Sequence, residues 1–247
     1  MKISDYLVLL PAFNEENTIH EVIEELSTIF PHNQIVLADD GSTDKTSKIA
    51  RKIGVRIIRN KNNRGKGHIL RNAFTVIIKN FPNVKWVITV DADGQHDIQD
   101  IPRFFQTIHQ NPETEIVIGK REYYRMPPIN RISNKLTSNW SNYWLNWNLQ
   151  DLQCGFRCYK TNALRSILEY GLKRNNFDLE TEILLVSWIL DLKVIDIPVR
   201  TLYPKNQRKS RIQPLIDSIR WMLLVIEFGF SLRFINKLWQ RRFLRKF

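Results

Sequence analysis

Cysteine is scarce in this chain, because only Cys154 and Cys158 occur among 247 residues. Two cysteines cannot staple a chain of this size, which excludes a disulfide-rich secreted scaffold and favours reduced thiols in a cytosolic compartment. The pair has neither a second Cys pair nor a His cluster beside it, so the spacing also argues against a structural zinc site.

Long apolar runs and flexible linkers are missing as well. A membrane-spanning helix needs roughly 18–20 apolar residues, and the longest candidate, 221–232, is interrupted by Glu227. The first 15 residues lack the basic start and apolar core of a secretory signal. With no Gly/Ser-rich linker between its halves, the sequence predicts one domain with C-terminal additions, no transmembrane helix and no leader.

Acidic residues are too few to balance the basic ones, and the imbalance lies in the second half. The chain has 37 Lys and Arg against 25 Asp and Glu, a net charge of +12. Residues 1–119 carry 14 basic and 15 acidic side chains, whereas residues 120–247 carry 23 and 10. This asymmetry indicates an anionic partner for the second half: nucleic acid, an anionic membrane surface or a phosphorylated substrate.

Short apolar runs alternate with segments of helical periodicity through the first half. This alternation predicts an α/β fold with a mostly parallel sheet and helices on both faces. Strands are expected at 6–10, 34–38, 55–58, 86–90 and 115–118, and helices at 17–29, 43–52, 68–79 and 101–109. The less regular second half predicts strands at 154–159 and 194–199, and helices at 179–190 and from 215 onward.

Two carboxylates follow the strand predicted at 86–90. Asp91 and Asp93, two residues apart, could share one hard divalent cation such as Mg²⁺ or Mn²⁺, which leaves positions open for phosphate oxygens. An isolated Asp-x-Asp triplet is usually a solvated turn. Its place after a buried strand, and a second acidic strand end at Asp39 and Asp40, favour a ligand site at the carboxyl ends of the strands.

Four ordered motifs carry a resemblance to a known family. They read PAFNEE at 11–16, DDGSTD at 39–44, NRGKG at 63–67 and DADGQH at 91–96. The set resembles the family 2 inverting glycosyltransferases of the GT-A fold, and DADGQH resembles the polyprenyl-phosphate sugar transferases of the dolichyl-phosphate mannose synthase type. The resemblance covers about residues 5–220. It implies a GT-A catalytic domain over 1–212, and we expect a basic, aromatic, amphipathic helical tail over 213–247.

The resemblance also implies roles for individual residues. The nucleotide-sugar pocket would be formed by Pro11, Ala12, Phe13, Glu15, Asp39, Asp40, Lys66, Asp91 and Ala92. Mg²⁺ or Mn²⁺ would be held by Asp91, Asp93 and Gln95. The residues implied in catalysis are Asp93, Arg121, Arg131 and Glu182, and those implied in binding the acceptor phosphate are Arg121, Arg131, Lys205 and Arg211.

The acceptor decides whether a general base is required. A sugar hydroxyl must lose a proton, and in many family 2 members the base falls at the position of Asp178, Glu180 or Glu182. Helix-start electrostatics is the alternative for Glu180 and Glu182. A polyprenyl phosphate is already anionic and needs cations instead. The second half supplies Arg121, Arg125, Arg131, Lys135, Arg200, Lys205, Arg208, Lys209 and Arg211.

Residues 228–247 contain six basic and six aromatic side chains and no acidic one. This composition is typical of attachment to an anionic membrane surface, so we expect a peripheral protein at the cytoplasmic face, with an integral membrane protein as a further candidate partner. The helical face of Trp140, Tyr143, Trp144 and Trp147 is either a second membrane contact or core.

The sequence thus predicts an enzyme that transfers a sugar from a GDP- or UDP-sugar to a polyprenyl phosphate, with a divalent metal. A glycolipid or saccharide hydroxyl acceptor is the alternative within the family. A nucleotidyltransferase would share the metal carboxylates, but the motif context favours sugar transfer. A non-catalytic membrane- or nucleic-acid-binding protein is the rival of another class. No nucleic-acid motif is present, and that reading leaves the acidic strand ends unexplained.

Overall fold

The computed structural model describes residues 2–122, 131, 134–135, 138–139, 141–143, 148–176, 178–202, 224, 227–228 and 235. The strands are β1 (Tyr6–Ala12), β2 (Ile35–Asp39), β3 (Arg56–Arg59), β4 (Trp86–Thr89), β5 (Ile116–Arg121), β6 (Arg157–Lys160) and β7 (Val194–Val199). The α-helices are α1 (Ile19–Ser27), α2 (Thr46–Ile53), α3 (Lys66–Asn80), α4 (Ile101–Gln110), α6 (Thr161–Tyr170) and α7 (Leu179–Ile189). Short 3₁₀ turns are η1 (Ile3–Asp5), η2 (His32–Gln34) and η3 (Ile98–Asp100).

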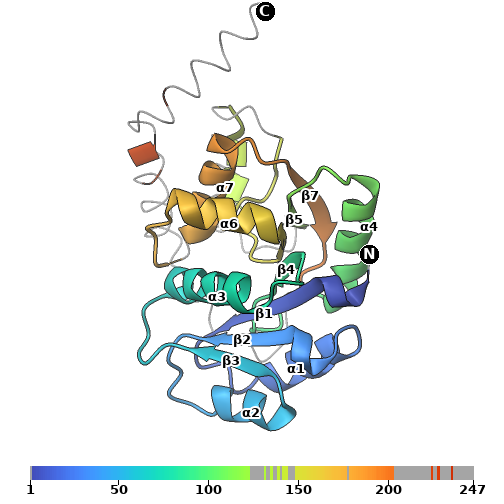
Figure 1. Cartoon of the computed structure of the whole chain (residues 1–247), viewed down its shortest axis with the longest axis vertical. Helices are drawn as coiled ribbons and strands as arrows, with labels where there is room; N and C mark the ends of the chain where they lie inside the picture. Colours follow the sequence, from blue (N-terminus) through green and yellow to red (C-terminus); the bar gives the residue numbers. More distant parts are fainter. Residues whose placement is uncertain are drawn as a thin grey trace, which may run out of the picture.

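The strands form one sheet in the order β3-β2-β1-β4-β6-β5-β7, flanked by helices (Figure 1). The neighbouring strands β3, β2, β1 and β4 are parallel, and so are β5 and β7. Strand β6 runs antiparallel to both of its neighbours. The prediction of a mostly parallel sheet is confirmed, and β1, β2 and β4 end along one edge.

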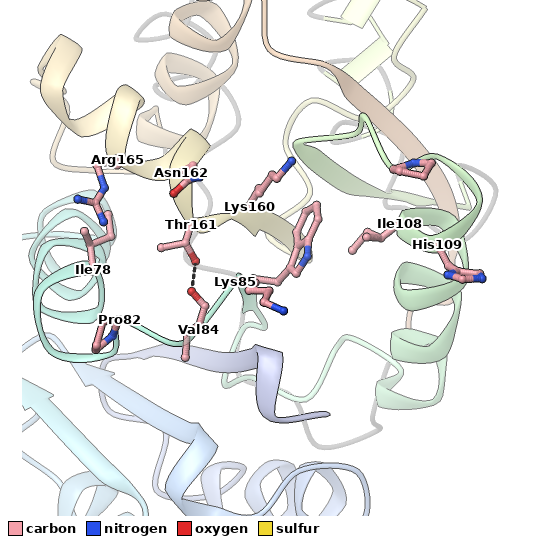
Figure 2. Close-up of a pocket in the computed structure, with 12 residues that line it drawn as sticks. Ile78, Pro82, Val84, Lys85, Ile108, His109, Lys160, Thr161, Asn162 and Arg165 are labelled. Carbon is pink, nitrogen blue, oxygen red and sulfur yellow. Dashed lines mark hydrogen bonds between the residues drawn. The ribbon is translucent and has the colours of Figure 1, made fainter. Parts of the chain in front are cut away.

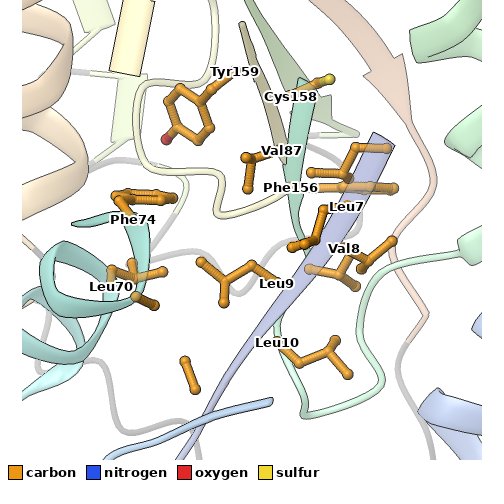
Figure 3. Close-up of a cluster of buried hydrophobic side chains, with 14 of the residues drawn as sticks. Leu7, Val8, Leu9, Leu10, Leu70, Phe74, Val87, Phe156, Cys158 and Tyr159 are labelled. Atoms are coloured by element: carbon orange, nitrogen blue, oxygen red, sulfur yellow. The ribbon is translucent and has the colours of Figure 1, made fainter. Parts of the chain in front are cut away.

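The core is built around β1. Every residue of β1 and β2 is buried, which explains their continuous apolar runs, since both faces of a covered parallel sheet need apolar side chains. Leu70 and Phe74 of α3 and Tyr159 of β6 pack beside the Leu7–Leu10 run (Figure 3). The Phe74 and Tyr159 rings meet edge to face at 5.5 Å.

The strand expected at 154–159 is β6 at 157–160, because residues 154–156 still belong to the preceding loop. The structure also has a helix that the sequence analysis does not predict, α6, whose buried residues include Ala163, Leu164 and Ile167. Both predicted free thiols are confirmed: Cys154 and Cys158 are unpaired and fully buried.

Several predictions fall outside the described residues. They include the boundary at 212/213, almost all of the predicted tail, and Trp140, Trp144 and Trp147. Tyr143 is described and is 78% exposed, so this member of the aromatic face is at the surface. Within the described part of the chain, no helix has the length and apolar content needed to cross a bilayer.

Helix α3 begins two residues earlier than the sequence predicted, at Lys66, and its start packs against the segment 172–176. Gly65, the residue before the helix, has φ +98°. A Cβ on Gly65 would overlap the Asn175 carbonyl oxygen and lie 2.6 Å from Oδ1 of Asn176, and one on Gly67 would lie 2.7 Å from the Asn175 carbonyl carbon. The backbone amide of His68 donates to the Asn175 carbonyl at 3.1 Å. The two glycines therefore admit close approach of the neighbouring segment that contains Asn175 and Asn176.

An ion pair between Arg121 and the buried Asp151 holds the end of β5 to the loop before β6. Arg121 donates from Nε and Nη2 to the two carboxylate oxygens of Asp151, at 2.7 and 3.0 Å. Asn134 donates to the same carboxylate at 2.7 Å. Burial by itself would raise the pKa of Asp151, but the Arg121 guanidinium outweighs it and holds that pKa below its usual range.

We expect Gly65→Ala to lower the free energy of unfolding more than Gly171→Ala. Gly171 has nearly the same φ, +97°, but a Cβ there would meet no atom within 4 Å. Gly171→Ala should therefore show only the backbone cost, roughly 1–3 kcal/mol, and Gly65→Ala at least about 1 kcal/mol more, because of overlap with residues 175–176. Urea denaturation of both variants measures the difference. Equal losses would contradict the close approach.

Asp151→Asn should destabilise the protein by about 3 kcal/mol at pH 7, because it leaves the Arg121 charge buried without its partner. A carboxylate whose folded pKa is depressed contributes stability above its unfolded pKa, about 3.9, and loses it as the pH falls through the folded value. The difference between wild type and variant should therefore shrink below about pH 4. Urea denaturation at pH 7, 4 and 3 tests this, and a difference that stays constant would rule out the ion pair as its source.

Candidate active site

The predicted motifs meet at the carboxyl edge of β1, β2 and β4. The PAFNEE motif runs out of β1, the DDGSTD motif out of β2 and the DADGQH motif out of β4. The Thr18 hydroxyl, which follows the first motif, donates to the Ala92 carbonyl in the last at 2.7 Å. The sheet thus brings together segments that lie more than 70 positions apart.

A single ammonium group lies at the centre of this edge. Nζ of Lys66 is 2.6 Å from Oδ1 of Asp91 and 2.8 Å from Oε1 of Glu180. Lys66 opens α3, Asp91 follows β4 and Glu180 is in the first turn of α7. On the other side of Asp91, Nε2 of His96 lies 3.3 Å from Oδ2. A Cβ on Gly155 would lie 2.6 Å from the same oxygen, so only glycine fits beside Asp91.

The charges of this cluster do not balance. Burial alone would raise the pKa of Asp91, but Lys66 and His96 outweigh it and lower that pKa. Burial alone would lower the pKa of Lys66, but Asp91 and Glu180 raise it. The pKa of Asp93 is raised, by burial and then by the neighbouring Asp91 charge. Asp91 and Glu180 share the Lys66 ammonium, and the Asp91 charge also acts on Asp93, so the excess of carboxyl groups favours a further cation.

The oxygen atoms of this edge suit Mg²⁺ or Mn²⁺. Asp91 and Asp93 offer hard carboxylate ligands, and Asp93 is oriented by the Gln95 amide, which donates to its Oδ1 at 3.0 Å. In the described part of the chain, no three His, Cys, Asp or Glu side chains form a closed cage. Mg²⁺ commonly binds one or two carboxylates and completes its shell with substrate phosphates and water. The donor set therefore fits a cation shared with a diphosphate.

The first motif forms a turn whose backbone is fixed by the second. Pro11 and Ala12 are the buried last residues of β1, and Phe13 and Glu15 follow in the half-buried turn. Asn14, at φ +55°, accepts from the Thr43 amide at 2.8 Å. The Glu15 amide donates to Oγ1 of Thr46 at 2.8 Å. The pocket residues predicted from the first motif therefore lie at the end of β1 and in the turn that follows it.

Asp39 and Asp40 hold neighbouring loops in this structure. Asp39 is fully buried, accepts from the Ser42 amide at 2.8 Å and lies 3.2 Å from Nε of Arg59. Asp40 accepts from the Arg64 and Gly65 amides at 3.0 and 2.7 Å. The resemblance implies that these carboxylates line the nucleotide-sugar pocket. Of their contacts with the loops, the bond from Asp39 to the Ser42 amide, three residues on, is a local one.

The two glutamates in the first turn of α7 have different partners. Glu180 contacts Lys66, whereas Glu182 accepts hydrogen bonds from the Lys173 and Arg174 amides at 3.0 and 2.9 Å. Burial raises the pKa of Glu182, and the two amides oppose the shift. Sequence reasoning placed Glu182 among the catalytic residues, but Glu180 is the one that meets the Asp91 cluster.

The predicted phosphate-binding cations are differently placed. Arg121 is engaged by Asp151, and Arg200 by Asp97 and Asp100. Arg131 is half-buried, and Lys205 and Arg211 lie outside the described residues.

A hollow of about 480 Å³ beside Lys160 and Arg165 lies at the opposite end of the β4–β6 pair from Asp91 (Figure 2). The carboxyl edge of the sheet therefore carries the candidate site.

Comparison with known proteins shows the family to which the chain belongs. Residues 7–169 match the profile described as Glycosyl transferase family 2. An uncharacterized protein of Methanocaldococcus jannaschii is 32% identical over 204 residues, covering 81% of this chain and 82% of that protein. A Methanococcus voltae UDP-N-acetylglucosamine–dolichyl-phosphate N-acetylglucosaminyltransferase is 26% identical over 249 residues, covering 90% and 96%.

A solved structure with the same fold is Mycobacterium tuberculosis glucosyl-3-phosphoglycerate synthase in complex with Mn²⁺, uridine diphosphate and phosphoglyceric acid. It aligns with a TM-score of 0.69 at 17% identity, over 90% of this chain and 77% of that one. This likeness concerns the fold and confirms the GT-A expectation. The family match, which includes all four motifs, shows that the chain belongs to glycosyl transferase family 2.

Proposed function

We propose that this chain transfers a sugar from a GDP- or UDP-sugar to a polyprenyl phosphate, with inversion at the anomeric carbon and with the help of Mg²⁺ or Mn²⁺. Family membership supports sugar transfer. The Methanococcus voltae relative, which spans nearly the same length, is named for a dolichyl-phosphate acceptor. The unbalanced carboxylates at Asp91 and Asp93 support a divalent cation.

We infer the class of acceptor from the hydrogen bonds and ion pairs of the three candidate general bases. Glu180 is ion-paired with Lys66 at 2.8 Å, and Glu182 accepts two backbone amides. Oδ1 of Asp178 accepts from the Asn176 amide at 3.3 Å. All three carboxylates are thus engaged by the protein. This favours an acceptor that is already anionic, because such an acceptor needs no general base.

In the proposed reaction, a phosphate oxygen of the lipid attacks the anomeric carbon as the bond to the donor diphosphate breaks. The nucleoside diphosphate leaves with the bonding electron pair. Asp91 and Asp93 would hold the metal, which supplies positive charge for the departing diphosphate. Lys66, whose Nζ lies 2.6 Å from Oδ1 of Asp91, fixes that carboxylate. Catalysis is then positioning and charge stabilisation, with no proton removed from the acceptor.

The lipid acceptor implies work at a membrane surface. The basic, aromatic composition of residues 228–247 supports peripheral attachment through the C-terminal segment, at the cytoplasmic face.

Purified protein with Mn²⁺, pooled nucleotide sugars and a short polyprenyl phosphate should yield a new sugar-phosphate-lipid mass. Asp93→Ala should lower turnover roughly 100-fold or more, because a developing charge loses its stabilisation, with an unchanged circular dichroism spectrum. Glu113→Ala, at an exposed ion pair with Lys193, is the matched control and should retain activity. Nucleoside diphosphate with free sugar but no lipid product would reject the acceptor class, and full activity of Asp93→Ala would reject the site.

Glu182→Gln should keep kcat with the lipid phosphate within about 10-fold of wild type, because glutamine still accepts a backbone amide and no base is required. Removal of a general base costs about 10²–10⁴-fold. Single-turnover rates with saturating donor separate the two cases. A loss in that larger range, with the melting temperature unchanged, would favour a hydroxyl acceptor and a catalytic Glu182.

A further inference from the structure

The residues that follow β7 run alongside the DADGQH motif. The Leu202 amide donates to the Gln95 carbonyl at 2.9 Å. His96 and Thr201 form an isolated antiparallel bridge. The backbone that carries Gln95 and His96 is therefore paired with residues 201–202, which lie more than 100 positions further along the chain.

Arg200 fastens this pairing to two buried carboxylates. Its amide donates to Oδ2 of Asp100 at 2.6 Å, and its Nη2 lies 3.2 Å from Oδ1 of the same residue. Its Nε lies 3.1 Å from Oδ2 of Asp97. Asp100 is 0% and Asp97 8% exposed, so both carboxylates need a counter-charge. The planar, forked guanidinium of Arg200 reaches the two carboxylates with different nitrogens, Asp97 with Nε and Asp100 with Nη2.

The backbone pairing includes His96, whose side chain contacts Asp91. The His96 ring is buried, lies 5.0 Å from the Phe156 ring, and places Nε2 3.3 Å from Oδ2 of Asp91. The position of this ring depends on the His96 backbone, which is bridged to Thr201. Arg200 therefore reaches Asp91 through three steps: Asp97 and Asp100, the 200–202 backbone, and His96.

We propose that Arg200 is a positioning residue for Asp91, and that it acts through His96 instead of binding the acceptor phosphate. This inference rests on the proposed function, because it assigns Asp91 to the donor and metal side of the site. Some groups contact a metal ligand without binding the metal themselves. Removing such a group typically changes metal affinity or activity 10–100-fold. Arg200→Gln should therefore act on the donor side of the reaction.

The experiment compares Arg200→Gln and Arg200→Lys with Arg103→Gln. Arg103 is the matched control, because it also lies 3.3 Å from Oδ1 of Asp100 and is similarly exposed, but its other bond is to the Pro198 carbonyl. The first readout is the His96 ring signal in ¹⁵N-histidine spectra of metal-free protein, identified by its loss in His96→Gln among the five histidines. The second is Mn²⁺ affinity measured by electron paramagnetic resonance. The third is KM for donor and for acceptor.

In Arg200→Gln we expect a shifted His96 signal, Mn²⁺ binding about 10-fold weaker, a raised donor KM and an unchanged acceptor KM. Arg200→Lys should lie between this variant and wild type, and Arg103→Gln should resemble wild type in all three readouts. A raised acceptor KM with an unshifted His96 signal would overturn the proposal in favour of a phosphate ligand. Equal loss of melting temperature in Arg200→Gln and Arg103→Gln, with all three readouts unmoved, would overturn it in favour of a purely structural residue.

The first two readouts need no substrate, so failure of the proposed acceptor chemistry can be told apart from failure of the positioning role. If no lipid product forms but the His96 signal and Mn²⁺ affinity change in Arg200→Gln alone, the positioning role stands and the acceptor class is wrong. If product forms and the substrate-free readouts stay fixed, the acceptor class stands and the positioning role is wrong.

Discussion

The contact of Lys66 with Asp91 and Glu180 organises the carboxyl edge of this sheet. It joins the first residue of α3, the loop after β4 and the first turn of α7 through one ammonium group. A half-buried and a buried carboxylate so close together would repel each other strongly without that charge. The contact also requires the glycines around it. Gly65 and Gly67 let the segment before α7 lie against α3, and Gly155 leaves room for Asp91.

The side chain of Arg157 also supports the contact between Lys66 and Glu180, by fixing the backbone of Glu180. Arg157 is fully buried and donates to the backbone carbonyls of Leu152, Cys154 and Glu180 at 2.7–2.8 Å. It therefore fixes the backbone that presents the Glu180 side chain to Lys66. Together with the Arg121–Asp151 and Arg200–Asp100 pairs, it shows that part of the positive charge of the second half is engaged by groups of the protein itself. Net charge alone thus overstates how many cations face a ligand.

The fold was largely predictable because its signals are local. Buried strands such as β1 and β2 leave continuous apolar runs, and amphipathic helices leave a 3.6-residue period. The start of α3 was misplaced because Gly65 and Lys66 read as loop residues until the contact with residues 175–176 is known. The α6 segment was missed because its buried stripe of Ala163, Leu164 and Ile167 is short and interrupted by polar residues.

The residue types of the site were predictable, but their partners were not. The motif pattern brought Asp91, Asp93 and Lys66 to one edge, since parallel strands end together. Nothing in local sequence, however, distinguishes Glu180 from Glu182, which differ by two positions in one helical turn. That difference turns one side chain toward Lys66 and the other toward the Lys173 amide. The same holds for Asp40, whose partners at 64 and 65 lie beyond any local pattern.

The distribution of charge along this edge also explains why an anionic donor can bind next to carboxylates. Lys66 offsets part of the charge of Asp91 and Glu180, and the pKa of Asp93 is raised by burial and then by the neighbouring Asp91 charge. In the proposed reaction, a divalent cation would satisfy Asp91 and Asp93 and still present positive charge outward. The diphosphate of a nucleotide sugar would supply further oxygen ligands, so the carboxylates would attract the anionic donor through the metal instead of repelling it.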